Sequence, residues 1–320
     1  MLVTPENFSE VCSIIWNESE LSLDTETTGL KPYQGSRAFP IIIATKTAEY
    51  YFNFNDSNDH LGQPPLAVLP REWVQILLTP IALNVLKTVY MANAKFDMHI
   101  LAQEGVTRWG CTVHDVLVMD RLDFNDHIKY SLDAVAKRHG FEKSDAVEEY
   151  IKEHKLWRWV TIPGKKKRDK NKWYAKVPLE IIVPYGERDA RITFDIGRKQ
   201  REKFTTKTWE APRPTPMNPY ETELRLTKVL YSMEREGIPV SETLCTERAQ
   251  SETEKYEAAA REFRDKTGVP LVDSAKVLTP IFQGLGLTPP KTDKGNDSLT
   301  DEWLETLEHP IARLIHKHIS

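Results

Sequence analysis

Apolar residues recur along this chain in two spacings, short alternating runs in its first part and helical stripes in its last part. Short apolar runs predict strands at residues 21–24 and 88–92 and a strand pair at 37–54 with a turn near 46–48. Helical spacing follows, with glycines that end two of the helices. The predicted helices occupy residues 95–104, 115–122 and 131–138. Strands that precede alternating helices predict an α/β fold with a mixed sheet.

A proline-rich stretch at residues 205–220 interrupts this pattern. Its prolines are Pro212, Pro214, Pro216 and Pro219. Prolines at this density neither continue a helix nor lie inside a sheet. We therefore predict a first domain at 1–208, a linker at 209–220 and a smaller all-α domain at 221–320. Its predicted helices are 221–236, 243–266, 273–284, 300–307 and 310–319.

Composition narrows the class of protein. With 40% hydrophobic and 28% charged residues the chain is able to form a core, which excludes global disorder. Its net charge, 43 − 47 = −4, excludes a uniformly basic surface but not a local basic groove. No apolar run is long enough to span a membrane, and residues 1–16 do not resemble a secretory signal. The three cysteines are widely spaced, which suggests neither a disulfide framework nor a CxxC zinc site. We expect a cytoplasmic protein without a membrane partner.

Two carboxylates end the first predicted strand. Because side chains alternate along a strand, Asp24 and Glu26 point to the same face. Like charges this close repel, and a divalent cation relieves the repulsion. A polar strand end or a helix cap is the alternative for this pair.

Two further pairs carry polar groups at a spacing of four. Asn93 precedes a predicted helix and Asp97 lies in its first turns, so Asn93 is either a helix cap or a site residue. Tyr185 and Asp189 lie one turn apart on another predicted helix and are able to reach one site. A packing tyrosine and a surface aspartate are the alternative there.

Taken in order, these motifs resemble the DEDD superfamily of 3′–5′ exonucleases, in the subtype whose third motif carries tyrosine. The resemblance spans about residues 20–200, and segments 113–117 and 131–136 look like the connecting helices of that family. It implies an RNase H-like fold and hydrolysis of a nucleic acid from its 3′ end with two divalent ions, Mg²⁺ or Mn²⁺.

The resemblance also assigns roles. Asp24, Glu26 and Asp189 would hold the ion that activates water, Asp24 would bridge to the second ion, and Asp97 would support that ion through water. Tyr185 would orient the attacking water. Thr27, Gly29 and Leu30 lie where relatives seat the 3′-terminal nucleotide. Asn93 and Phe96 are further candidate contacts, Phe96 either as a platform for a base or as a core residue.

A basic segment precedes the third motif. Lysines and arginines dominate between Trp157 and Tyr174, and its densest run is Lys165, Lys166, Lys167 and Arg168. Phosphate contacts from such a run raise affinity for DNA without sequence preference. A solvated hairpin tip and a nuclear-localisation signal are the alternatives.

The last hundred residues carry a second resemblance. Segments 233–240, 273–276 and 290–295 look like the start of the thumb in family A DNA polymerases. This implies that the thumb binds primer–template DNA, with Lys291 and Lys294 in contact with phosphates. The exonuclease domain would bind a single-stranded 3′ end. The palm and fingers are expected after Ser320, so a separate polypeptide that supplies them is a further expected partner.

The chain is therefore predicted to be the proofreading module of a phage or bacterial family A DNA polymerase. Two alternatives remain open, an exoribonuclease of the same superfamily and a non-catalytic DNA-binding or polymerase-assembly subunit.

Overall fold

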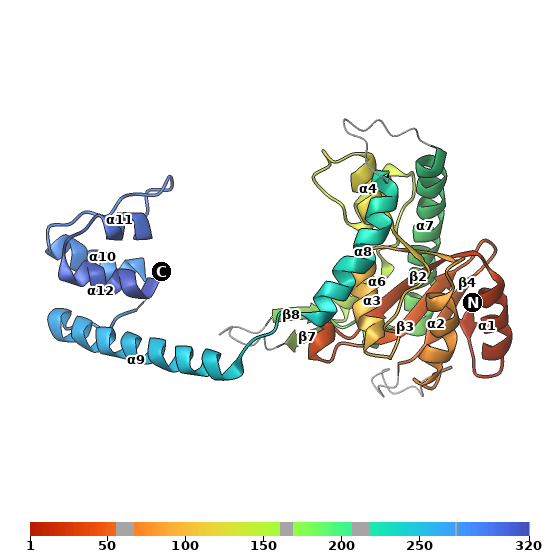
Figure 1. Cartoon of the computed structure of the whole chain (residues 1–320), viewed down its shortest axis with the longest axis horizontal. Helices are drawn as coiled ribbons and strands as arrows, with labels where there is room; N and C mark the ends of the chain where they lie inside the picture. Colours follow the sequence, from red (N-terminus) through yellow and green to blue (C-terminus); the bar gives the residue numbers. More distant parts are fainter. Residues whose placement is uncertain (56–66, 161–168, 207–217, 273, 320) are drawn as a thin grey trace. The chain divides into compact units, whose positions relative to one another are not determined.

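A six-stranded mixed sheet, in the order β1-β4-β3-β2-β5-β6, organises the first part of the chain in the computed structural model (Figure 1). The structure describes residues 1–55, 67–160, 169–206, 218–272 and 274–319. The strands of the sheet are β1 (Leu2–Val3), β2 (Glu20–Thr27), β3 (Ala38–Ala44), β4 (Glu49–Asn53), β5 (Thr88–Met91) and β6 (Thr112–Asp115). Strand β2 pairs antiparallel with β3 and parallel with β5, which confirms the predicted α/β fold and mixed sheet.

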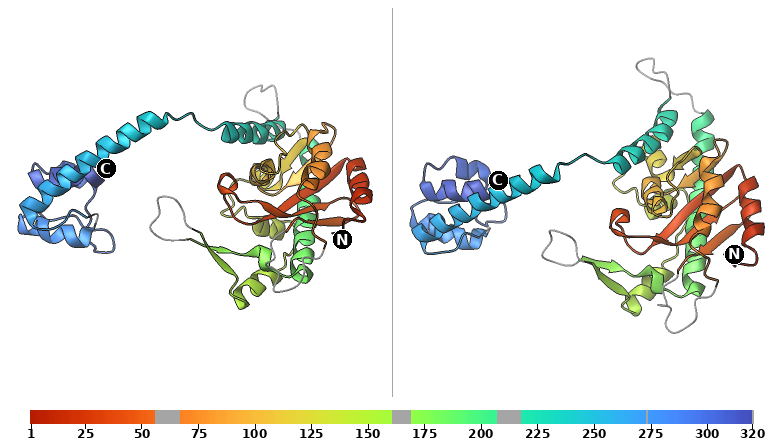
Figure 2. Two further views of the ribbon diagram at one scale, coloured as in Figure 1. Left: turned by 90° about the horizontal axis from the view of Figure 1, so that it is seen from below. Right: turned by 60° about the horizontal axis from the view of Figure 1, so that its bottom comes forward.

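Helices cover both faces of this sheet, as the two views in Figure 2 show. Helices α1 (Phe8–Asn17), α2 (Trp73–Leu83) and α3 (Ala94–Ala102) share one buried core with Leu21, Leu23 and Ile41. The other core joins Ile42 and Tyr51 to the helices of the second face. Those helices are α4 (Val116–Asp123), α5 (Leu132–Arg138), α6 (Ala146–Glu153) and α7 (Leu179–Thr206). Alternation along the strands separates the two cores.

Helix α7 lies close to the sheet because two small residues face it. A Cβ atom at Gly186 would lie 3.1 Å from Ile42 Cγ1, and one at Gly197 would lie 2.3 Å from Tyr90 Cδ1. The two glycines are three turns apart, so one side of α7 contacts the strands along its length. This contact sets the height at which the residues between them, including Asp189, lie above the sheet.

Helix α8 (Pro219–Glu236) packs against α3, α4 and β6. The Tyr220 hydroxyl is 3.1 Å from His114 Nδ1, and the Tyr231 hydroxyl donates to the Thr107 carbonyl at 3.3 Å. The chain consequently divides into two compact units, Met1–Gly237 and Ile238–Ser320. This division differs from the boundary predicted at 209–220, because the packing of α8 joins it to the first unit.

The second unit is helical. It consists of α9 (Glu242–Thr267), α10 (Ala275–Gly284), α11 (Asp301–Glu305) and α12 (Pro310–Ile319). Phe263 of α9 and Phe282 of α10 form its core with apolar residues of α11 and α12. This confirms the helical character predicted for the C-terminal part. None of the described helices combines the length and the apolar character needed to cross a membrane.

Most of the strands and helices predicted for the first unit are confirmed, and one predicted helix is wrong in part. The strand pair at 37–54 and the helices at 95–104, 115–122 and 131–138 match β3, β4, α3, α4 and α5. Of the segment 113–117, predicted as a connecting helix, only Val116 and Leu117 are helical, because Thr112–Asp115 pairs in parallel with β5 as strand β6. Two more strands, β7 (Trp157–Val160) and β8 (Asp169–Lys172), form an antiparallel hairpin that extends away from the sheet (Figure 2).

Candidate active site

The first two acids lie near the carboxyl end of β2, on the face that α7 covers. Asp24 and Glu26 are partly buried, and Thr25 between them is buried. Ser22, two positions before Asp24 on the same face, donates to the Ala190 carbonyl of α7 at 2.7 Å. The pairing of β2 with β3 shifts register between Thr25 and Thr27. Such a bulge re-aims side chains at the end of a strand, here around Glu26.

The third acid, Asp97, lies in the first turn of α3. Asn93 precedes this helix with a φ of 63° and makes no side-chain cap, so the cap predicted for its side chain is absent. The cap comes instead from Asp115, which accepts from the Ala94 amide at 2.7 Å and from the Leu117 amide of α4 at 3.0 Å. One buried carboxylate therefore begins two helices and aims α3 at the site.

Asp97 is buried and connects directly to the strand that carries the first two acids. The Thr25 hydroxyl donates to Asp97 Oδ1 at 2.6 Å. Thr25 itself is buried between Asp24 and Glu26. The hydrogen bond therefore holds α3 against the end of β2.

Helix α7 supplies the remaining two predicted groups. Tyr185 is partly buried and Asp189 is buried one turn later. Lys143, from the loop between α5 and α6, places its Nζ 2.5 Å from Asp189 Oδ2 and 5.5 Å from the centre of the Tyr185 ring. The other carboxylate oxygen, Asp189 Oδ1, is buried and has no hydrogen-bond partner.

Each of the four acids lies near enough to another of them for the charge of one to raise the pKa of the other. Burial and the charge of Asp189 raise the pKa of Asp24 to about 7. Burial and the charges of Asp24 and Asp189 raise the pKa of Glu26 well above its usual range. Burial and the charge of Asp24 do the same for Asp97. Burial also raises the pKa of Asp189, and Lys143 opposes that rise.

The tyrosine belongs to the same electrostatic group. Burial raises the pKa of Tyr185, and the charges of Glu26 and Asp189 raise it further. The phenol therefore stays protonated at neutral pH and remains able to donate a hydrogen bond.

These residues suit hard divalent cations by the nature of their donors. Within the described part of the chain, no three acidic, histidine or cysteine side chains lie close enough together to form a metal-binding group. The acids nevertheless offer carboxylate oxygens that repel one another, and Asp189 Oδ1 is buried without a partner. Oxygen donors of this kind select Mg²⁺ or Mn²⁺, so the residues present fit such ions.

The other predicted contacts are distributed around the site and the second unit. The Thr27 hydroxyl donates to the Gly29 carbonyl at 2.8 Å, while Leu30 is 71% exposed. Phe96 is half-buried and packs against the core of its face. In the second unit Lys291 pairs with Asp297 at 2.6 Å, and Lys294 is exposed. Lys165, Lys166, Lys167 and Arg168 lie outside the described residues.

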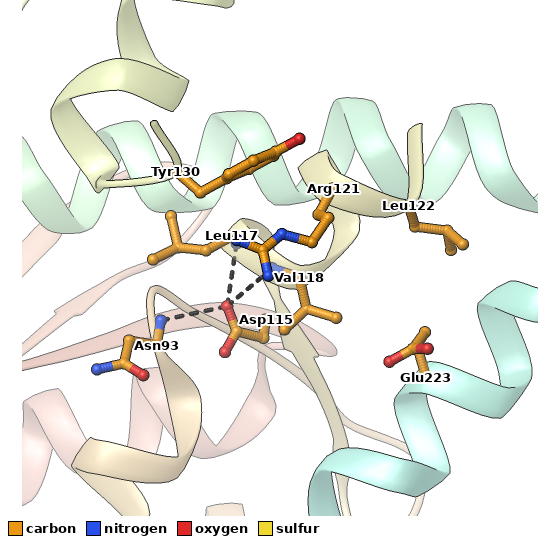
Figure 3. Close-up of a pocket in the computed structure, with 8 residues that line it drawn as sticks. All are labelled: Asn93, Asp115, Leu117, Val118, Arg121, Leu122, Tyr130 and Glu223. Carbon is orange, nitrogen blue, oxygen red and sulfur yellow. Dashed lines mark hydrogen bonds between the residues drawn. The ribbon is translucent and has the colours of Figure 1, made fainter. Parts of the chain in front are cut away.

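A cavity of about 560 Å³ adjoins Asn93 (Figure 3). The guanidinium carbon of Arg121 lies 4.3 Å from the centre of the Tyr130 ring, and the Tyr130 hydroxyl donates to the Phe124 carbonyl at 2.7 Å. Glu223 of α8 lines the opposite side. The cavity therefore presents an aromatic ring, a cation, an amide and the carboxylates of Asp115 and Glu223 beside the helix that carries Asp97.

Comparison with known proteins identifies the family. A family model described as 3′–5′ exonuclease, of the DNA polymerase A type, matches residues 1–204. The chain belongs to this exonuclease family. Divalent metal ions are general to exonucleases of this family.

Similar proteins include DNA polymerases of phages and bacteria. DNA polymerase DpoZ of Salmonella phage PMBT28 is 25% identical over 313 residues, which cover 94% of this chain and 46% of the relative. DNA polymerase I of Chloroflexus aurantiacus is 26% identical over 315 residues, 95% of this chain and 30% of the relative. The chain thus spans less than half the length of these two relatives.

Solved structures show the same fold. The POL domain of Pol1 from M. smegmatis, in complex with DNA primer-template and dNTP, matches 99% of this chain and 47% of its own, with a TM-score of 0.60 and 17% identity. The exoribonuclease RNase D of Escherichia coli matches 84% of this chain and 55% of its own, with a TM-score of 0.51 and 11% identity. At these identities the likeness concerns the fold alone.

Sequence patterns missed three residues of the site. Lys143 lies in a loop and belongs to no motif, and Thr25 is hidden between the two acids of the first motif. Tyr174 lies near Glu26. Burial is the main cause of the raised pKa of this tyrosine, and the charge of Glu26 raises the pKa further. Of these three, only Thr25 could have been found from the sequence. Because side chains alternate along a strand, Thr25 points to the face opposite Asp24 and Glu26, which is the face that α3 covers with Asp97.

Proposed function

We propose that this chain hydrolyses DNA from its 3′ end, one nucleotide at a time, with divalent metal ions, and serves as the proofreading module of a family A DNA polymerase. The observation that carries the proposal is that β2, α3 and α7 bring four acids and one tyrosine near enough to affect one another's pKa, with Thr25 of β2 hydrogen-bonded to Asp97 of α3. Membership of the exonuclease family supports it.

In this proposal Asp24, Glu26, Asp97 and Asp189 are the ligands of two ions, Mg²⁺ or Mn²⁺. When bound, these ions neutralise charge on the scissile phosphate and lower the pKa of a bound water. Tyr185, protonated at neutral pH, donates a hydrogen bond that orients the attacking water. The Thr25 hydroxyl keeps Asp97 in place.

The cavity beside Asn93 suits the strand that leads to the scissile bond. Single-stranded DNA is bound through aromatic rings that stack on bases and cations that meet phosphates. Tyr130 offers the ring, and Arg121, whose guanidinium carbon lies 4.3 Å from the ring centre, offers the cation. Arg121→Ala should raise KM for single-stranded DNA and leave kcat little changed. Arg108→Ala, which removes an exposed arginine elsewhere in this unit, is the matched control.

The second unit extends the proposal to primer–template DNA. The alignment with phage and bacterial DNA polymerases covers nearly the whole chain, beyond the exonuclease match at 1–204. We assign the unit as the start of a thumb, with Lys291 and Lys294 as phosphate contacts. Palm and fingers would act with this thumb, whichever polypeptide carries them.

The proposal is tested with 5′-labelled single-stranded and mismatched duplex DNA. The expected result in Mg²⁺ is a ladder that shortens from the 3′ end, abolished by EDTA and in Asp24→Ala and Asp189→Ala. Full activity in either variant would remove that acid from the site. An RNA strand of the same sequence, degraded faster than the DNA, would indicate an exoribonuclease instead. Binding of DNA without shortening in Mg²⁺ or Mn²⁺ would indicate an assembly subunit.

A further inference from the structure

Lys143 is placed unusually for a lysine. Its side chain is 17% exposed, and its Nζ lies 2.5 Å from Asp189 Oδ2. It shares with Tyr185 the lining of a cavity of about 510 Å³ between the α5–α6 loop and α7. A long, flexible side chain held this way loses conformational entropy and part of its hydration, so its contacts must offset both.

Its positive charge acts on more than its direct partner. Lys143 opposes the raised pKa of Asp24 and Glu26 as well as that of Asp189. These are the three acids assigned above to the ion that activates water. Arg188, the other cation that acts on Asp189, donates its guanidinium to the Glu142 carbonyl at 3.1 Å. The lysine is thus the cation in direct contact with the acidic group.

The two oxygens of Asp189 have different environments. Oδ2 contacts Lys143, whereas Oδ1 is buried and unpartnered. An unpaired buried oxygen is costly unless a ligand completes it. A carboxylate that ligates a metal through one oxygen is commonly held in orientation by a partner on the other.

We propose that Lys143 is a positioning residue, which holds Asp189 by Oδ2 so that Oδ1 is presented to a divalent cation. The proposal rests on the proposed metal-dependent exonuclease and adds a residue that no sequence motif contains. Lys143 contacts neither the substrate nor the reacting atoms in this role. Its effect on the reaction passes through Asp189.

Binding of Mn²⁺ alone tests the proposal without any nuclease assay. Electron paramagnetic resonance counts free Mn²⁺ in titrations of the full chain at pH 8. Loss of an outer partner of a metal ligand commonly weakens metal affinity ~10–100-fold. We expect a loss of this order in Lys143→Met, and a smaller one in Lys143→Arg, which keeps the charge. Lys199→Met, which removes an exposed lysine that lies over the Phe141 ring, should bind Mn²⁺ as the wild type does.

The nuclease assay supplies the second readout. In Lys143→Met the Mg²⁺ concentration for half-maximal rate should rise by the same factor as the Mn²⁺ dissociation constant, with most of the rate recovered at saturating Mg²⁺. Lys143→Gln replaces the Met variant if urea unfolding shows that the latter is not folded. A merely structural role would lower the rate at every Mg²⁺ concentration.

The possible results separate this proposal from the proposed function. Unchanged Mn²⁺ affinity in Lys143→Met, with a nuclease-active wild type, would overturn the role of Lys143 alone. Tighter Mn²⁺ binding in that variant would also overturn it, because it would mean that the ammonium group competes with the metal. Weaker Mn²⁺ binding in a chain that does not shorten DNA would support the positioning role and contradict the exonuclease.

Discussion

Replacing Asp24 by asparagine should stabilise the metal-free protein at neutral and alkaline pH. Asp24 has a pKa of about 7 in the folded chain, against an ordinary value of 3.8, because burial and the nearby charge of Asp189 disfavour its ionised form. Folding therefore opposes ionisation of this group. Asparagine has nearly the same shape and does not ionise, so the variant avoids the cost.

The size of the effect follows from the two pKa values. Below pH 3.8 the carboxyl group is protonated in the folded and unfolded chains, and its contribution to stability is fully present. As the pH rises towards 7 the unfolded chain ionises first, so stability is lost through this window. The difference of about 3 pKa units, at about 1.4 kcal/mol each, gives about 4 kcal/mol at pH 8. At pH 4 the expected difference is below about 1 kcal/mol.

Urea unfolding in EDTA measures this difference directly. Tryptophan fluorescence reports on the first unit if both proteins carry Trp303→Phe, since Trp303 is the tryptophan of residues 238–320. Asp126→Asn, at an exposed carboxylate, is the matched control and should show no such pH dependence. Mg²⁺ should raise the free energy of unfolding of the chain with Asp24 and have a much smaller effect on Asp24→Asn.

An Asp24→Asn protein that is no more stable than its parent at pH 8 in EDTA would refute this reasoning. So would an advantage of equal size at pH 4 and pH 8, because a pH-independent gain would come from packing rather than from ionisation.

Three further substitutions test separate parts of the structure. Tyr185→Phe should slow the exonuclease while Mn²⁺ affinity stays unchanged; an unchanged rate would exclude the tyrosine from the reaction. Thr25→Val removes the hydrogen bond to Asp97 and should lower the free energy of unfolding by about 1–3 kcal/mol in urea titrations, and a neutral result would mean that the bond contributes nothing. Gly197→Ala should cost about 1–3 kcal/mol in the same titrations, because the new Cβ would lie 2.3 Å from Tyr90. Lys199→Ala, at an exposed position of the same helix, is its control.

Local patterns were sufficient for much of this fold and for naming the acids of the candidate site. Alternation along β2 places Asp24 and Glu26 on one face, and helical spacing places Tyr185 and Asp189 one turn apart, because both relations depend only on the period of the element. The contact of Lys143 with Asp189 joins a loop to a distant helix, and no period encodes it. It arises only when α7 packs across the sheet.

The domain boundary and strand β6 illustrate the same limit. Prolines mark where a helix stops, but whether the next helix leaves the domain depends on what it packs against. Helix α8 packs on the first unit because the Tyr220 hydroxyl contacts His114 and the Tyr231 hydroxyl donates to the Thr107 carbonyl. Residues 112–115 become a strand because they pair with β5. A short apolar segment does not predict this non-local contact.

The identity of the first product tests the central claim most directly. A single DNA strand labelled on its 3′-terminal nucleotide is incubated with the full chain and Mg²⁺, and products are separated at early times. The account predicts that a labelled nucleoside 5′-monophosphate is released first, and that neither EDTA-treated protein nor Asp189→Ala releases it. Release of a longer oligonucleotide first, or release that persists in EDTA or in Asp189→Ala, would contradict a metal-dependent 3′–5′ exonuclease at this site.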